Sequence, residues 1–160
     1  SLLLTACGID KNIKKGEKYL ALGEYYDAAD QFKQAYTKTP TKEREKRGQR
    51  ALKMAFCYEK INATPKAVAA YRNAIRYGQA NIQNRLSYAR QLLKNGDYKI
   101  AQTEFKSILD SLPNEEMSKK GYDILARNGL KSAQAAPEWK KKGSRYTVKK
   151  MMPIDRKSVV

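Results

Sequence analysis

Small and large apolar residues recur at a helical spacing in three segments of the chain. In each segment an alanine is followed four residues later by an aromatic residue and seven residues later by a small or aliphatic one. Residues four apart share one face of an α-helix, so a small side chain lies beside a large one and a neighbouring helix can approach closely. The three sets are Ala28, Phe32 and Ala35; Ala67, Tyr71 and Ala74; and Ala101, Phe105 and Ile108.

A second helix is predicted before each of these, which gives three helix pairs. The preceding helices carry a small residue where a larger side chain would push the pair apart, at Gly16, Ala55 and Ala89. Gly23-Glu24 and Gly96-Asp97 combine a flexible glycine with an acid that can accept from free N–H groups. Thr64-Pro65 combines a capping residue with proline at the first helical position. These residues predict helix–turn–helix units.

Corresponding residues lie 39 positions apart from Ala28 to Ala67 and 34 apart from Ala67 to Ala101. A period of 34 with these turn residues resembles the tetratricopeptide family over residues 9 to 113. The resemblance implies an all-α fold, an α-solenoid of about three helix-turn-helix repeats; an unrelated helical bundle is the alternative. The additional residues of the longer interval fall within 41–48, where they would lengthen a connection or add a turn to the next helix, and we expect them to lie outside the packed core.

The C-terminal third is predicted to close the stack and then leave it. Residues 114–131 have the pattern of a further helix that covers the open end of the repeats, so the repeat domain spans residues 13–131. Gln134 to Pro137 interrupts that pattern, and residues 132–160 are predicted to form a basic linker. Within it, residues 146–148 have the pattern of a strand. We expect the native protein to continue into a further domain.

The N-terminus has the features of a lipoprotein signal. An apolar run precedes Cys7, and Leu4-Thr5-Ala6-Cys7-Gly8 resembles the bacterial lipobox. The resemblance implies that residues 1–6 are a signal-peptide remnant, that Cys7 is acylated, and that residues 7–12 form a lipid-anchored N-terminus. It also implies the periplasmic face of the outer membrane, because the retention and surface-export signals known after such cysteines are absent. The alternative is an ordinary apolar helix start.

Charge and missing residue types limit the chemistry. The chain has 33 Lys and Arg against 16 Asp and Glu, a net charge of +17, and it has no histidine. Nucleic acid, anionic lipid and cell-wall polymer all fit such a charge, although lysines also commonly cover solvated helix faces. Without histidine or a glycine-rich phosphate loop, we expect no enzymatic activity, no metal site and no cofactor. Cys57 is expected to be a buried, inert thiol.

A repeat stack offers a concave surface lined by the first helix of each pair. The family's groove positions correspond here to Leu52, Phe56, Glu59 and Lys60 of the second repeat and to Leu86, Arg90, Leu93 and Lys94 of the third. Apolar and basic groups alternate, which suits an extended or helical peptide with apolar anchors and acidic flanks. The alternative for the apolar residues is a place in the core. Family members that grip a terminal carboxylate have Lys and Asn where this chain has Leu52 and Phe56, so we do not expect that ligand.

A lipobox followed directly by tetratricopeptide repeats, a Lys-rich linker and a strand-like segment resembles the N-terminal part of one family of Bacteroidetes outer-membrane lipoproteins. Members of that family combine repeats, a β-propeller and an OmpA-like domain, and one of them belongs to the type IX secretion system. The resemblance implies a non-enzymatic adaptor whose partners are other protein subunits of a membrane complex, with peptidoglycan bound only through a domain outside this chain. One alternative is a stand-alone lipoprotein of the barrel-assembly or pilotin kind. Another is a basic repeat protein that binds nucleic acid, which only the charge favours.

Overall fold

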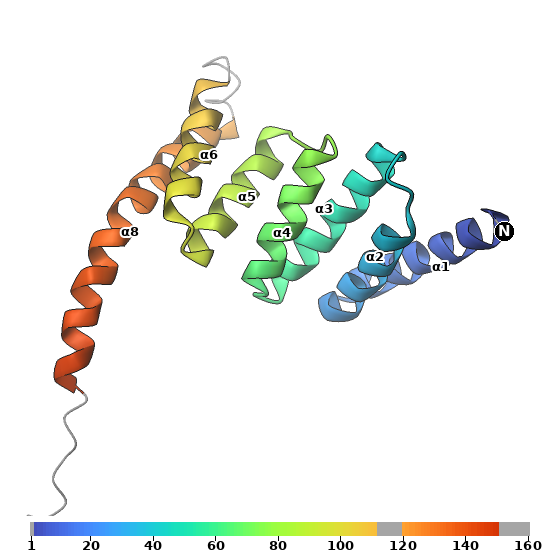
Figure 1. Cartoon of the computed structure of the whole chain (residues 1–160), viewed down its shortest axis with the longest axis horizontal. Helices are drawn as coiled ribbons and strands as arrows, with labels where there is room; N and C mark the ends of the chain where they lie inside the picture. Colours follow the sequence, from blue (N-terminus) through green and yellow to red (C-terminus); the bar gives the residue numbers. More distant parts are fainter. Residues whose placement is uncertain (1, 112–119, 151–160) are drawn as a thin grey trace, which may run out of the picture.

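The computed structural model describes residues 2–111 and 120–150, with side chains described for residues 7–111 and 120–137. The regular structure of these ranges is α-helical, and each helix packs antiparallel against the next along the chain (Figure 1). The helices are α1 (Leu2–Ala21), α2 (Tyr25–Lys38), α3 (Arg44–Lys60), α4 (Thr64–Arg76), α5 (Ile82–Asn95), α6 (Tyr98–Asp110) and α8 (Tyr122–Lys150). The predicted all-α fold is confirmed, and the packing is consistent with a tetratricopeptide-like solenoid. Helices α1 and α8 lie at opposite ends of the stack (Figure 1).

Four helices end in the same way, with one residue in the left-handed region and the next amide bonded to the carbonyl five residues back. The left-handed residues are Gly23, Asn62, Gly78 and Gly96, with φ of 74°, 56°, 101° and 86°. The four amide–carbonyl distances are all 2.9 Å. This Schellman geometry satisfies carbonyls that a helix end leaves free, and glycine adopts it without steric cost. The predicted glycine turns are confirmed.

The predicted side-chain caps of these turns are wrong. Glu24 and Asp97 precede α2 and α6 but make no capping bond, and α4 begins at Thr64 itself. Their ψ angles of 68° and 56° depart from the extended backbone that usually aims a cap at the helix. Asn81 has that backbone, with ψ of 164°, and its side chain accepts from the amide of Asn84 at 2.8 Å.

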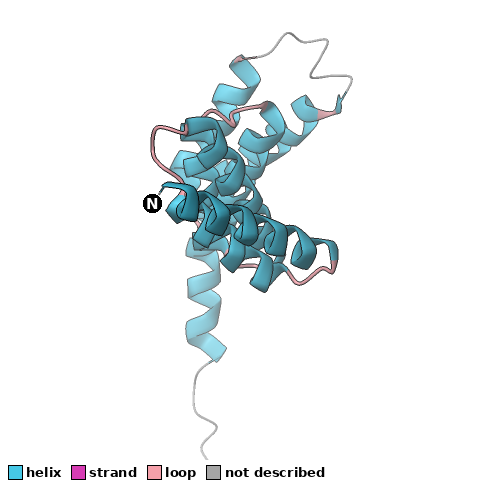
Figure 2. Ribbon diagram, turned by 90° about the vertical axis from the view of Figure 1, so that its right-hand side faces the viewer, coloured by secondary structure: helices cyan, strands magenta, loops and turns pink. Residues whose placement is uncertain are grey.

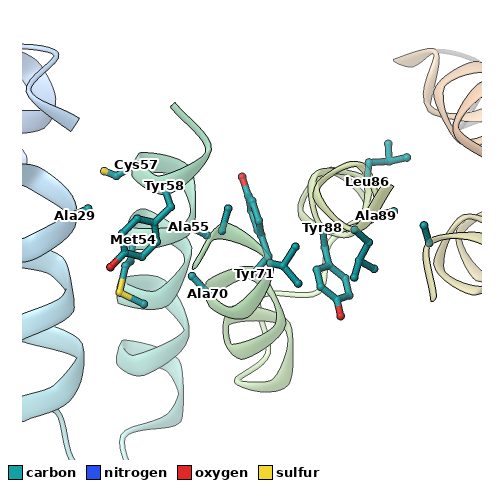
Figure 3. Packing of buried hydrophobic residues seen from close by; sticks show 14 of the residues in the cluster. Ala29, Met54, Ala55, Cys57, Tyr58, Ala70, Tyr71, Leu86, Tyr88 and Ala89 are labelled. Atoms are coloured by element: carbon teal, nitrogen blue, oxygen red, sulfur yellow. The ribbon is translucent and has the colours of Figure 1, made fainter. Parts of the chain in front are cut away.

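Small residues let the helices approach around buried aromatic rings, as the spacing predicted. Phe32 and Phe105 are fully buried. A Cβ atom on Gly16 would come within 2.7 Å of the Phe32 ring, and one on Gly129 within 2.3 Å of the Phe105 ring. Figure 3 shows Tyr58, Tyr71 and Tyr88 from α3, α4 and α5 interleaved with alanines. The core is therefore a continuous row along the stack.

The segment 41–48 does not lie outside the packing, contrary to the prediction. Its last residues form the first turn of α3, which is one of the two predicted possibilities, but Gly48 is buried so closely that a Cβ atom would lie 3.0 Å from the carbonyl oxygen of Tyr77. The guanidinium of Arg47 lies 4.2 Å from the Tyr36 ring centre and 5.2 Å from that of Tyr77. Its Nη1 donates to the carbonyl oxygen of Thr39 at 2.6 Å. The insertion thus joins the C-terminal ends of α2 and α4.

Helix α8 covers the end of the stack, as predicted of a closing helix, by packing against α6 and α5. Its exposed side includes Arg127, Lys131 and Gln134 together with the apolar Ile124 and Leu125, so that end has a mixed surface. The helix begins at Tyr122, and residues 114–119 of the predicted helix lie outside the described residues.

The predicted break at residues 134–137 and the predicted strand at 146–148 are wrong, because α8 continues through both. The alanines around Pro137 favour the helix, and Ala133 is fully buried. The part of the predicted linker beyond Lys150 lies outside the described residues.

Candidate ligand groove

We define the groove surface by seven predicted residues that are exposed or half-buried: Leu52, Phe56, Glu59 and Lys60 of α3, and Arg90, Leu93 and Lys94 of α5. Phe56 is 39% exposed, unusual for a phenylalanine, and its ring meets Tyr25 of α2 edge-on at 6.1 Å between centroids. The ammonium of Lys60 lies 5.2 Å from the centre of the Phe56 ring. An aromatic side chain with a cation over its face is thus available on this surface.

The α5 part of the groove surface is basic. Arg90 and Lys94 are exposed. The Lys94 ammonium donates to Oδ1 of Asn62 at 2.6 Å, which ties the end of α5 to the turn between α3 and α4. Leu93 is half-buried between these cations and the core.

Leu86 does not belong to the groove surface, which corrects its prediction as a groove residue. Its side chain is 3% exposed and lies in the same buried cluster as Ala126 and Ala133 of α8. Helix α8 packs against α5 as well as α6, and this additional contact accompanies the burial of Leu86. No ligand can reach it in this arrangement.

Glu59, the acid of the groove surface, is hydrogen-bonded to a tyrosine that is buried beneath that surface. Glu59 Oε2 accepts a hydrogen bond from the hydroxyl group of Tyr71, which is 3% exposed. Burial, together with this bond to a carboxylate, raises the pKa of Tyr71 well above its ordinary value of 10, so the phenol stays protonated. Within α5, Arg90 Nη2 lies 3.5 Å from the hydroxyl oxygen of Ser87. One oxygen of the Glu59 carboxylate is therefore tied to the buried Tyr71, and the half-buried side chain keeps its negative charge at the groove surface.

A cavity of about 470 Å³ extends the groove surface toward α8. The described residues that line it are Leu93, Tyr98, Lys131, Ser132, Ala135 and Ala136. Tyr98 occupies the place in its repeat that Tyr25 occupies in the first, two residues after the turn glycine. Phe56 covers Tyr25, whereas the cavity beside Tyr98 is bordered by small side chains of α8.

The cavity residues other than Leu93 were missed by sequence reasoning, which treated the two Gly-acid-Tyr segments as turns only. The repetition of tyrosine at positions 25 and 98 was the available signal. The contribution of α8 had no such signal, because residues 132–136 were assigned to a linker.

The groove surface carries net positive charge in the described part of the chain. Lys60, Arg90 and Lys131 are exposed, and none forms an ion pair with a described acid. The nearby acids are already engaged, since Glu59 accepts from Tyr71 and Glu17 pairs with Lys53. An anionic group approaching this surface meets cations that no described acid neutralises in an ion pair.

The two cysteines have opposite environments. Cys7 is exposed on α1, and Cys57 is fully buried in α3. Burial raises the pKa of the Cys57 thiol to about 11, so it is not a nucleophile near neutral pH. Both thiols are free.

The described residues contain no group of three or more His, Cys, Asp or Glu side chains that could hold a metal ion. Nor does any helix described here combine the length and apolar character needed to cross a membrane. No family model matches the chain, and no curated protein is significantly similar to it. The geometry of the groove surface is thus the main guide to function.

Proposed function

We propose that this chain is a non-enzymatic protein-binding scaffold whose groove surface takes a peptide segment with a large apolar anchor and flanking acidic residues. The observation that carries the proposal is Phe56, which remains exposed while Lys60 lies over its ring and Arg90 lies exposed on the neighbouring first helix. An aromatic residue and an arginine near the middle of a surface are typical of binding hot spots.

The groove surface and the cavity have complementary roles in this proposal. Apolar side chains of the partner would be buried against Phe56 and in the cavity beside Tyr98, where each buried large side chain contributes about 2 kcal/mol. Acidic side chains would face Arg90, Lys94 and Lys131, which sets the direction and speeds the encounter more than it adds affinity. A pre-formed helical stack loses little conformational entropy on binding.

We further propose that the scaffold is held at a membrane through acylation of Cys7, as part of a secretion-machine adaptor of the type IX kind. The supports are the lipobox-like segment, the exposure of Cys7 on α1, and the helical repeats that follow that segment directly. Labelling of cells with radioactive palmitate tests the anchor. The label should enter the protein and be absent from the Cys7→Ser variant; an unlabelled protein, or label retained by the variant, contradicts it.

The scaffold role is tested by capture of protein partners from membranes of the source organism. Reversing the charge of Arg90 and Lys94 to glutamate should abolish capture without changing helix content measured by circular dichroism. The matched control reverses two exposed lysines of α6, Lys99 and Lys106, and should retain capture. Retained capture by the groove variant contradicts the proposal, and capture lost after nuclease treatment would favour nucleic acid.

A further inference from the structure

A row of lysines runs along the outward face of α1. Lys11, Lys14, Lys15 and Lys18 are all exposed. Because successive residues of an α-helix are about 100° apart, Lys11, Lys14 and Lys18 point within about 40° of the direction of Cys7, and Lys15 within about 80°. The lysines and the cysteine therefore share one face of the helix, which we call the lysine face.

Buried contacts hold the opposite face of α1 against α2, and these fix the rotation of the helix. Ile9, Asn12 and Gly16 are buried. The Asn12 side chain is engaged on both atoms, since its Nδ2 donates to Gln31 and Gln34 at 2.9 and 3.0 Å and its Oδ1 accepts from Lys38 at 2.9 Å. The lysine face is thus held outward at the end of the stack, which Figure 2 views from the α1 side.

The distance between the anchor and the packed domain is very short. Ile9 is 8% exposed and packs only two residues after Cys7, with Gly8 alone between them. Two residues span at most about 7 Å even when fully extended. If Cys7 carries acyl chains, as the proposed function holds, α1 lies within reach of the lipid headgroups without a spacer.

The lysine face has no acidic partner within the described residues. None of its four lysines forms an ion pair or a side-chain hydrogen bond there. Glu17, on the flank of the helix, pairs with Lys53 of α3, and Asp10 lies about 60° from the direction of Cys7. With the exposed Asp10 on the same face, the four lysines still leave the lysine face a net positive charge that can act on an external anion.

We propose that the lysine face of α1 is a membrane-docking surface that lies on anionic phospholipid headgroups. This inference rests on the proposed acylation for its setting, but it concerns a separate surface. Each lysine near an anionic membrane strengthens binding by about fivefold, and an acyl anchor combined with a basic patch gives stable attachment. The stack then stands on its α1 end, and α8 lies at the end far from the bilayer (Figure 1).

Exposed lysines also serve to keep the open end of a repeat stack polar, so the experiment must separate docking from solvation. The probe is a pair of vesicle preparations, phosphatidylcholine alone and phosphatidylcholine mixed with phosphatidylglycerol. The full chain with Cys7→Ser is used, so that no acyl chain contributes. One variant in this background replaces Lys11, Lys14 and Lys18 with glutamine, and its matched control replaces Lys33, Lys99 and Lys106, which are exposed on α2 and α6.

The parent chain should bind the phosphatidylglycerol vesicles and not the neutral ones in a flotation assay, with binding that weakens as salt rises. The lysine-face variant should bind more than tenfold more weakly than the parent, and the control variant within about threefold of it. Equal losses in the two variants, or no preference of the parent for anionic vesicles, would overturn the docking surface. Palmitate labelling and partner capture are measured separately, so a failure here is distinct from a failure of the anchor or of the groove.

Discussion

Gln102 on α6 donates a hydrogen bond from Nε2 to the carbonyl oxygen of Ala133 on α8, at 3.0 Å. Pro137 lies four residues after Ala133 and has no N–H group, so this carbonyl cannot receive its usual helical bond. The Gln102 side chain supplies the missing donor from a neighbouring helix. The donor from Gln102 replaces the N–H group that proline lacks, and α8 continues through Pro137.

Removing the Gln102 amide should therefore lower the free energy of unfolding more when Pro137 is present than when position 137 is alanine. We expect Gln102→Leu to lower the free energy of unfolding by about 1 kcal/mol or more, because the Ala133 carbonyl is left without a partner. In a Pro137→Ala background, the alanine N–H restores the helical bond and the same change should cost much less. Urea unfolding of the four proteins measures the coupling; equal costs in both backgrounds would show that the two residues act independently.

The close contact between Gly129 of α8 and the Phe105 ring of α6 should leave no room for a side chain at position 129. Gly129→Ala places a Cβ atom where the Phe105 ring lies, so we expect a loss of about 2 kcal/mol through overpacking. Gly8→Ala is the control, since nothing lies within 4 Å of the added carbon and alanine favours helix. Thermal unfolding compares the two. A Gly129→Ala protein as stable as the Gly8→Ala protein would contradict the close packing of α8 on α6.

Local patterns were sufficient to predict most of the fold. Alanine four residues before an aromatic ring marks a helix that packs closely, and Gly23 and Gly96 mark turns that only a left-handed residue makes easily. The continuation of α8 could not be predicted in this way, because Pro137 alone indicates a break and its missing donor is replaced by Gln102, a residue distant in sequence.

The groove could be predicted only in part for a similar reason. The family's positions found Phe56 and Arg90, which are exposed, but they also selected Leu86, which is buried in a cluster that includes residues of α8. They also gave Glu59 as a ligand contact, and its carboxylate accepts a hydrogen bond from Tyr71 of a different helix, which no repeat position predicts. Which side chains are free is decided by contacts between helices, and a repeat position does not contain that information.

Arg47 should stabilise the fold, although its side chain is charged and it lies in the insertion. Arg47→Ala removes its stacking on Tyr36 and Tyr77 and its bond to the Thr39 carbonyl, so we expect a loss of about 2 kcal/mol. Lys46→Ala is the control, because its ion pair with Glu43 lies at the surface, where solvent screens it and its contribution is small. Chemical unfolding measures both, and similar small losses would mean that the insertion does not contribute to packing.

Stability should fall at alkaline pH through Cys57. Its pKa in the folded chain is about 11, above the ordinary value of 9.0, so folding favours the neutral thiol. That contribution is fully present below about pH 9 and is lost as the pH rises through about 11. The urea midpoint of the Cys7→Ser chain should therefore fall over this range. The decline should be smaller once Cys57 is also replaced by alanine; an equal decline in both proteins would assign it entirely to other groups, such as Tyr71.

Photo-crosslinking from the groove surface tests the scaffold proposal most directly. A benzoylphenylalanine in place of Phe56 should crosslink a defined protein partner in intact membranes, and the same group in place of Ala69, exposed on α4, should not. The crosslink at position 56 should disappear when Arg90 and Lys94 are reversed to glutamate. No adduct at position 56, or an equal one at position 69, would contradict a protein-binding groove on the first helices of the repeats.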